Sequence, residues 1–124
     1  MNLVQVALAD GFDGEAFEKL SKLSNFSVAR NKKKLTPDEL NQILPEVNCL
    51  VVRSATKVNE DLLSRAQNLK LVIRAGEGVD NIDLASCQKR GVLVSNTPGA
   101  NNNSAAEHAI SLMFSLLRKI PTAN

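Results

Sequence analysis

The sequence has few of the side chains that build metal, flavin and redox sites. Its 124 residues include no tryptophan or tyrosine, one histidine (His108) and two cysteines, Cys49 and Cys87. A zinc site needs Cys and His ligands at short spacings, and neither a Cys-x-x-Cys pair nor a second histidine is present. We therefore expect no metal site, and two thiols that are buried, unpaired and inert.

A strong charge bias and a long apolar run are also missing. The formal net charge of +2 is too small to indicate nucleic-acid binding, and the one basic run, Lys32-Lys33-Lys34, is interpreted as a solvated loop. No stretch approaches about 18 consecutive apolar residues, and Met1 leads into a strand-like run rather than a signal peptide. We expect a cytoplasmic protein without a nucleic-acid or membrane partner.

The sequence does contain a regular alternation of short apolar runs and helical patterns. The runs are continuously apolar, which is typical of strands covered on both faces, and they predict strands at 3–9, 26–30, 49–53, 71–75 and 92–95. Helices are predicted at 13–24, 36–44, 59–66, 83–89 and 104–120. Right-handed crossovers then give an α/β fold. We expect a five-stranded parallel, doubly wound, flavodoxin-like sheet with helices on both faces and strand order 2-1-3-4-5.

Each predicted helix begins at a residue that can cap it. Thr36 with Glu39 and Ser104 with Glu107 have the spacing of capping boxes, and the other caps are Asp13, Asn59 and Asp83. The last helix reads LMFSLL at 112–117, apolar nearly all round. One sheet face cannot cover such a helix, so we expect a second partner, either another subunit or a further domain.

A glycine turn, Gly76-Glu77-Gly78, follows the predicted fourth strand. A dinucleotide fingerprint would need a third glycine where Asn81 stands, and an acidic residue after the next strand, where Ser95-Asn96 stand. The turn is therefore a poor dinucleotide site.

A smaller anion suits this turn better, because glycines let backbone N–H groups face a ligand. Parallel strands bring their carboxyl ends to one edge, where Arg53-Ser54, Arg74 and Asn101 are expected. Arginine matches the geometry of carboxylates and phosphates. The alternative, surface arginines beside an ordinary βα turn, stays open at this point.

Three segments carry a resemblance to a known family, both in their order and in their spacing: VVRSATKVNEDLL, IRAGEGVDNIDL and GVLVSNTPGANNNSAAEHA. They resemble the substrate-binding half of the NAD-dependent D-2-hydroxyacid dehydrogenases, most closely the members that act on a phosphorylated substrate. The resemblance is strongest from residue 50 to 121 and extends back to residue 3.

The resemblance implies a role for each matching position. The backbone amides of Gly76 to Val79 would hold the carboxylate of a small anionic substrate, and Arg53 and Arg74 would hold the substrate and its phosphate. The full set of implied substrate residues is Arg53, Ser54, Arg74, Ala75, Gly76, Gly78, Val79 and Asn101, with cofactor contacts from Glu77 and Ser104. Glu77 replaces a small threonine common in the family, so we expect its carboxylate to point outward or to pair with a basic residue.

The resemblance also implies a division of the chain. Residues 1–100 would form the substrate-binding domain, and residues 101–124 an interdomain helix that packs on a further domain or forms a homodimer. NAD would be bound mainly by a Rossmann domain absent from this chain, together with the catalytic groups. His108 is no substitute, because its helical neighbour Glu107 points about 100° away.

Two other functions of flavodoxin-like folds fit this sequence poorly. A phosphoacceptor domain needs an acidic cluster and an aspartate after the third strand, whereas Asp10 stands alone and that strand ends in Arg53-Ser54. A flavin-binding protein usually needs aromatics beside its ring, and the chain has neither Trp nor Tyr. Two alternatives stay open: a dehydrogenase half for glyoxylate, hydroxypyruvate or D-lactate, and a non-catalytic binding or assembly module.

Overall fold

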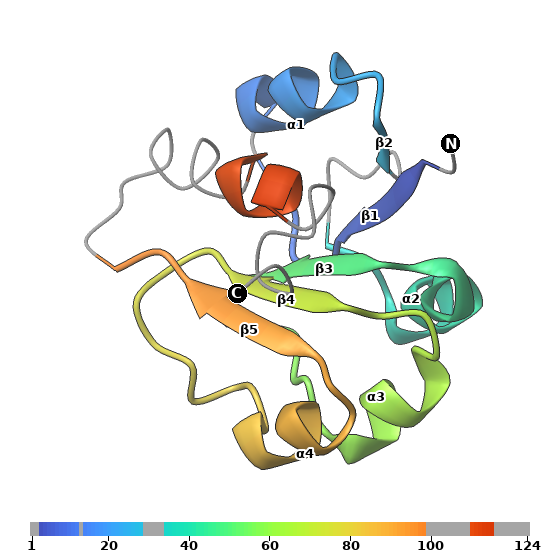
Figure 1. Ribbon diagram of the computed structural model, residues 1–124, viewed down its shortest axis with the longest axis vertical. Coiled ribbons are helices and arrows are strands. Elements are labelled where there is room, and N and C mark those ends of the chain that lie inside the picture. The colour runs from blue at the N-terminus through green and yellow to red at the C-terminus, as the bar shows by residue number, and fades with distance from the viewer. Residues whose placement is uncertain (1–2, 13, 29–33, 99–109, 116–124) are drawn as a thin grey trace.

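The computed structural model describes residues 3–12, 14–28, 34–98 and 110–115. Strands and helices alternate along the chain (Figure 1). Their order is β1 (Val4–Leu8), α1 (Gly14–Ser21), β2 (Phe26–Val28), α2 (Pro37–Ile43), the 3-10 helix η1 (Leu44–Glu46), β3 (Cys49–Val52), α3 (Glu60–Arg65), β4 (Leu71–Arg74), α4 (Leu84–Lys89) and β5 (Leu93–Asn96). A further helical segment covers 110–115.

The five strands form one sheet in the order β2-β1-β3-β4-β5, and every pairing is parallel. The predicted fold class and strand order are therefore confirmed. Several predicted boundaries differ from the observed ones, and two of them have a clear structural reason. The first helix ends at Ser21 rather than near residue 24, because the Leu23 N–H bonds back to the Leu20 carbonyl and tightens the chain into a turn. The fifth strand runs to Asn96 rather than Ser95 because the β4 pairing extends to Arg74↔Asn96.

Local capping fixes where three of the helices begin. Thr36 Oγ1 accepts the Glu39 N–H at 3.2 Å, and a Glu39 carboxylate oxygen accepts the Thr36 N–H at 2.8 Å, which completes the predicted capping box. Asn59 and Asp83 cap α3 and α4 through Leu62 N–H and Ser86 N–H. These caps satisfy backbone groups that a helix end leaves unpaired.

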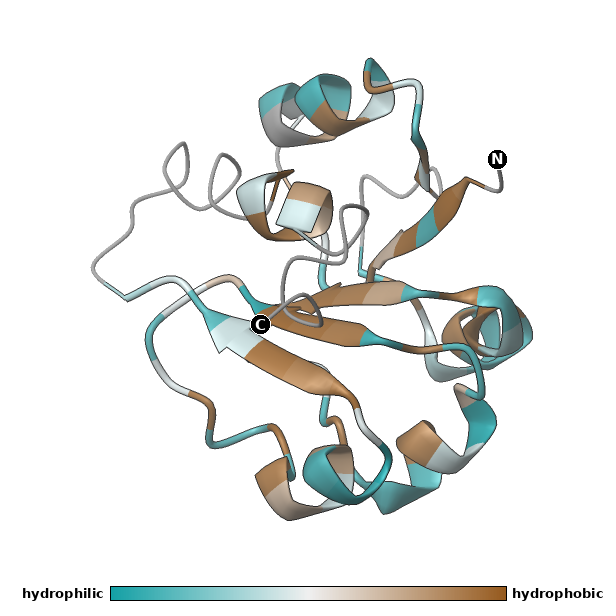
Figure 2. Cartoon of the chain, viewed as in Figure 1, coloured by the Kyte–Doolittle hydropathy of each residue, from teal (hydrophilic) through white to brown (hydrophobic). Residues whose placement is uncertain are grey.

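Side chains alternate across the sheet and divide the core into two layers. Leu50, Val52 and Val72 face α2, α3 and α4, whereas Val51 and Ile73 face α1 and the 110–115 segment. Figure 1 shows these helices on opposite sides of the sheet, and Figure 2 shows the apolar strands between them. Coverage is weaker at the sheet edges: Leu93 of β5 is 47% exposed, and β2 is buried only at Phe26.

The 110–115 segment closes part of the α1 face. Met113 is fully buried there, and Phe114 meets Phe26 edge-on with ring centroids 5.7 Å apart. Most of the predicted 104–120 helix, including Ser104 and His108, lies outside the described residues, so its role in self-association stays a prediction. None of the helices in the described part of the chain is long and apolar enough to cross a membrane.

Candidate functional site

The strand pairing brings three chain segments to one edge of the sheet. Val52, the last residue of β3, pairs with Arg74, and Arg74 pairs with Asn96 at the end of β5. The chain leaving β3 at Arg53 therefore runs beside the chain leaving β4 at Ala75, whose N–H bonds to the Val52 carbonyl at 2.8 Å. This edge carries the sequence-predicted residues Arg53, Ser54, Arg74 and the glycine turn.

The loop that starts at Arg53 is held on one side by Asp10, which follows β1. One carboxylate oxygen of Asp10 accepts the N–H of Arg53 at 2.7 Å and that of Thr56 at 3.1 Å. The other oxygen accepts the Thr56 hydroxyl at 2.5 Å. Hydrogen bonds to a charged acceptor are among the stronger ones. The backbone position of Arg53 is therefore fixed although its side chain is exposed.

The same loop is held on its other side by Asn81, which follows the glycine turn. Its Nδ2 donates to the carbonyls of Arg53 and Thr56, both at 2.7 Å. Sequence reasoning treated Asn81 only as a missing glycine and Asp10 only as an isolated acid. Neither role had a local sequence signal, because these bonds connect residues 25 to 46 positions apart.

Arg74 folds back over the glycine turn. A Cβ on Gly76 would lie 3.2 Å from Arg74 Nε and 3.4 Å from its Nη2, and Gly76 has a φ of +155°. The backbone conformation therefore favours glycine here, and a side chain at this position would also push the guanidinium aside by a few tenths of an ångström. The Arg74 side chain and the glycine turn are therefore packed against each other.

The Arg74 guanidinium is also unusual in its hydrogen bonding. Its Nε and Nη1 atoms are buried, and neither has a hydrogen-bond partner among the residues that the structure describes. Buried polar atoms are nearly always paired, and a cationic donor without an acceptor is especially costly. These two N–H donors of Arg74 could therefore bind an anion at the edge of the sheet where an anion site was predicted.

The backbone amides of the turn are not equivalent. The Gly76 N–H donates to the Thr97 hydroxyl at 2.8 Å, and Thr97 is 2% exposed, so this amide is engaged inside the protein. Within the described part of the chain, the N–H groups of Gly78 and Val79 make no recorded hydrogen bond. Beside them, a Cβ on Gly78 would lie 2.9 Å from an Asp80 carboxylate oxygen. The amide role of Gly76 to Val79 stays a prediction, with Gly78 and Val79 the better placed donors.

The remaining predicted residues divide between structural and undescribed positions. Ala75 and Val79 are half-buried and pack against the two core layers. Glu77 is exposed, and its carbonyl accepts the Asn96 Nδ2 at 2.8 Å, which ties the turn to β5. Asn101 and Ser104 lie outside the described residues.

The clear pKa shifts in the structure have structural causes. Burial raises the pKa of the Cys49 thiol to about 12, and both cysteines are free and buried, as expected. A hydrogen bond from Arg90 lowers the pKa of Glu60, and the Ser86 N–H lowers that of Asp83. Because both thiols are buried, neither is suited to act as a nucleophile. Within the described residues, no group of three His, Cys, Asp or Glu side chains is placed to hold a metal ion.

Comparison with known proteins decides what this edge belongs to. Residues 6–118 match the catalytic domain of the D-isomer-specific 2-hydroxyacid dehydrogenases. The chain belongs to that family.

Two curated relatives illustrate the relationship. D-3-phosphoglycerate dehydrogenase from Archaeoglobus fulgidus is 41% identical over 121 residues, which is 98% of this chain and 23% of that protein. Hydroxypyruvate reductase from Thermotoga maritima is 44% identical over 119 residues, which is 96% of this chain and 38% of that protein. The chain thus spans between about a quarter and two-fifths of the length of these relatives.

Solved structures similar to this chain agree with the fold. The NAD⁺-bound 3-phosphoglycerate dehydrogenase of Entamoeba histolytica superposes with a TM-score of 0.70 at 25% identity, over 91% of this chain and 39% of that one. The PH0520 protein of Pyrococcus horikoshii gives a TM-score of 0.66 at 28% identity, over 97% of this chain and 35% of that one.

The described residues of this dehydrogenase domain do not fit NAD by themselves. The third glycine position of a dinucleotide loop is taken by Asn81, whose side chain holds the Arg53 loop. The Gly76 N–H is engaged with Thr97, and β5 ends in Asn96 rather than an acid that could hold a ribose. These contacts give a dinucleotide site at this turn no support.

Proposed function

We propose that this chain is the substrate-binding part of a dehydrogenase that oxidises 3-phospho-D-glycerate to 3-phosphohydroxypyruvate, the entry step of serine biosynthesis. The observation that carries the proposal is Arg74, whose Nε and Nη1 are buried beside Gly76 without an acceptor from any described residue. A phosphate or carboxylate would supply the missing acceptors. The family membership and the phosphoglycerate dehydrogenase relatives support the same substrate class.

In this proposal the two arginines bind the substrate and the glycine turn orients it. Arg53 and Arg74 leave neighbouring strands at the same edge and together match the charge of a phosphate. The Gly78 and Val79 amides hold the carboxylate, which fixes the C2 hydroxyl relative to the rest of the site. NAD and the acid–base group are assigned to a separate nucleotide-binding domain, so the chain alone is expected to be inactive.

Residues 1–100 and 101–124 are proposed as two functional parts of the chain. The first is the substrate-binding domain, and the second is a helix for contact with the nucleotide-binding domain or with a second copy. We propose a cytoplasmic homodimer. Static light scattering across micromolar concentrations tests the assembly, and a monomeric mass throughout would contradict it.

A second candidate substrate is hydroxypyruvate, which lacks the phosphate. It is favoured by the hydroxypyruvate reductase relative, whose identity of 44% is close to that of the phosphoglycerate enzyme. Under this alternative Arg53 and Arg74 would bind the carboxylate and the keto oxygen of hydroxypyruvate. The affinity for a phosphorylated ligand would then be no higher than for its unphosphorylated counterpart.

An amide NMR titration separates these proposals. 3-Phosphoglycerate, hydroxypyruvate and D-lactate are added to the chain, to Arg53→Ala and to Arg74→Ala. We expect 3-phosphoglycerate to shift the amides of Arg53, Arg74 and residues 76–79, and each alanine variant to weaken binding. Arg90→Ala is the matched control, because it removes an arginine that pairs with Glu60 instead. Equal affinity for hydroxypyruvate would favour the second candidate, and unchanged affinity in both arginine variants would reject the proposed site.

A further inference from the structure

The glycine turn is held by hydrogen bonds to the segment that ends β5. The regular pairing of β4 with β5 ends at Arg74 and Asn96, where the two strands finish side by side (Figure 1). Beyond it the Gly76 N–H donates to the Thr97 hydroxyl at 2.8 Å, and the Thr97 N–H donates to the Gly76 carbonyl at 3.0 Å. The Asn96 Nδ2 donates to the Glu77 carbonyl at 2.8 Å. Two consecutive residues after β4 are therefore fixed by two consecutive residues of the neighbouring segment.

Thr97 is unusual in its burial. It is 2% exposed, and no other polar or charged residue in the described part of the chain is buried to this degree. A buried hydroxyl costs free energy unless it is hydrogen-bonded, and its recorded partner is the Gly76 N–H. A valine would fill nearly the same space without that cost. What threonine adds at this position is an acceptor for the turn.

The orientation of the turn matters because the turn carries groups that attract an anion and groups that repel it. The N–H groups of Gly78 and Val79 make no recorded hydrogen bond within the described part of the chain. The side chains of Glu77 and Asp80 flank them and are exposed. An anionic ligand is attracted by backbone amides and repelled by carboxylates. A rotation of the turn would therefore exchange attraction for repulsion.

The two arginines of the site are held by other contacts. Arg74 belongs to β4, which pairs with β3 and β5 as far as that residue. The Arg53 N–H donates to Asp10, and the Arg53 carbonyl accepts from Asn81. Loss of the hydrogen bonds from β5 would therefore release the turn, whereas both arginines would keep their backbone positions.

We propose that Thr97 and Asn96 are positioning residues that determine the preference of this site for a phosphorylated ligand that also carries a carboxylate. The inference rests on the proposed function, in which the turn holds the carboxylate and the arginines hold the phosphate. Thr97 and Asn96 act through the turn, because they fix Gly76 and the Glu77 carbonyl. The amides that follow then face the ligand.

The test compares three ligands in amide NMR titrations of the chain. They are 3-phosphoglycerate, glycerol 3-phosphate, which lacks the carboxylate, and D-glycerate, which lacks the phosphate. Thr97→Val and Asn96→Ala should each weaken 3-phosphoglycerate by roughly three- to tenfold, as expected for the loss of one hydrogen bond. D-glycerate should weaken to a similar degree, and glycerol 3-phosphate much less.

The ratio of the affinities for 3-phosphoglycerate and glycerol 3-phosphate is the decisive readout. A merely structural role would lower both affinities alike, because a loss of folded protein affects every ligand equally. Under the proposal the ratio falls in Thr97→Val and in Asn96→Ala. Thr97→Ser keeps the hydroxyl and should restore the ratio.

Two matched controls make the same chemical changes elsewhere. Thr36→Val removes a hydroxyl that also accepts a backbone N–H, at the start of α2. Asn68→Ala removes an amide that also donates to a carbonyl at 2.8 Å. Both should leave the ratio unchanged, and an equal fall in either control and its partner variant would overturn the positioning role.

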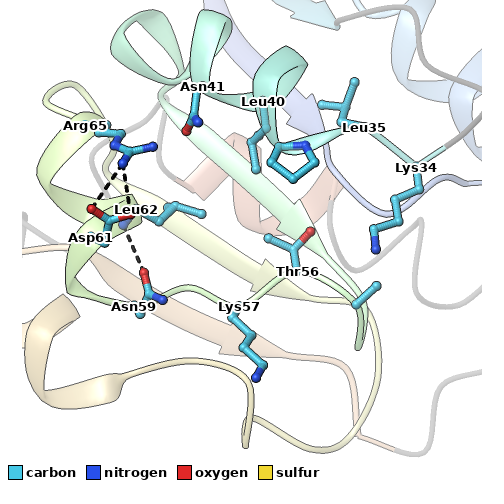
Figure 3. Close-up of a pocket in the computed structure, with 12 residues that line it drawn as sticks. Lys34, Leu35, Leu40, Asn41, Thr56, Lys57, Asn59, Asp61, Leu62 and Arg65 are labelled. Atoms are coloured by element: carbon cyan, nitrogen blue, oxygen red, sulfur yellow. Dashed lines mark hydrogen bonds and ion pairs between the residues drawn. The ribbon is translucent and has the colours of Figure 1, made fainter.

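The hollow between α2 and α3 serves as an internal reference for adventitious binding. Leu40 and Leu62 belong to its lining (Figure 3), which contains neither Asn96 nor Thr97 nor any of residues 76–79. We expect the ligands to shift the amides of residues 76–79 and to leave those of Leu40 and Leu62 in place. Equal shifts at both places would show non-specific binding and would overturn the proposal.

The arginine variants separate this inference from the proposed function. Suppose Arg53→Ala and Arg74→Ala weaken 3-phosphoglycerate, but the ratio is unchanged in Thr97→Val or is not restored in Thr97→Ser. The positioning role is then overturned and the proposed function stands. Unchanged affinity in both arginine variants would reject the proposed function, and the positioning role would fall with it.

Discussion

The carboxylate of Asp10 accepts the backbone N–H of Arg53 at 2.7 Å, across 43 positions of sequence. The same carboxylate takes the N–H and the hydroxyl of Thr56, and Asn81 holds the carbonyls of both residues from the other side. The exposed Arg53 side chain thus extends from a loop whose backbone is held by four hydrogen bonds, at the N–H and carbonyl groups of Arg53 and Thr56. Precise anchoring of this kind lowers the entropy lost when the side chain binds a ligand.

Replacing Asp10 should loosen this loop. Asp10→Ala removes the acceptor for two N–H groups and one hydroxyl, so we expect it to lower the free energy of unfolding by about 1–3 kcal/mol. Urea unfolding measures this loss, and a 3-phosphoglycerate titration should show weaker binding. Asp38→Ala, an exposed acid in the first turn of α2, has the same charge change. An equal loss in both variants would show that the contacts of Asp10 do not matter.

Asn81 offers a prediction with a definite pH dependence. Asn81→Asp replaces a double donor with an acceptor that faces two carbonyl oxygens 2.7 Å away. The ionised carboxylate is disfavoured in the folded protein, so its folded-state pKa is raised above the unfolded value of about 3.9. The variant should therefore lose stability relative to the parent as pH rises through that folded-state pKa. Urea midpoints at pH 4 and pH 7 measure this, with Asn25→Asp as the exposed control, and a loss that does not grow with pH would contradict it.

The glycine turn should not tolerate a side chain at its first position. Gly76→Ala would force an L-residue to a φ of +155° and place its Cβ 3.2 Å from Arg74 Nε. We expect a loss of about 1–3 kcal/mol in the free energy of unfolding, together with displacement of Arg74 and weaker anion binding.

Two other glycines separate the causes of that effect. Gly91→Ala has the backbone strain without the contact, because Gly91 has a φ of +68° and open space around it. Gly14→Ala has neither and lies at the start of α1, so it should be neutral or slightly stabilising. Anion binding should fall only in Gly76→Ala, and a similar fall in Gly91→Ala would refute the role of the Arg74 contact.

Cys49 should make the protein sensitive to alkaline pH. Burial raises its folded-state pKa to about 12, whereas an unfolded cysteine titrates near about 8.5. Stability from this group is complete below the unfolded pKa and is lost as pH rises toward 12. Cys49→Ala should flatten the fall in the free energy of unfolding over this range. Thiol-reactive dye at pH 8 should label Cys49 only after unfolding, and rapid labelling of the native chain would contradict its burial.

Much of the fold could be predicted from the sequence because its causes are local. A capping box needs only Thr36 and Glu39 three residues apart, and a helix cap needs only Asn59 or Asp83 before the first turn. Continuous apolar runs predicted strands buried on both faces, and the rule of right-handed crossovers restricted their order. The confirmed order β2-β1-β3-β4-β5 is one of the common doubly wound orders that these patterns favour.

The site could be predicted only in outline. The sequence placed Arg53, Arg74 and the glycine turn at one edge, because parallel strands bring their carboxyl ends together. It gave no sign that the Gly76 N–H is taken by Thr97, that Arg74 lies over Gly76, or that Asp10 and Asn81 hold the Arg53 loop. Each of these depends on the three-dimensional position of side chains from different strands. Sequence patterns of a few residues determine where strands and helices form, whereas hydrogen bonds between distant segments exist only after the sheet has brought those segments together.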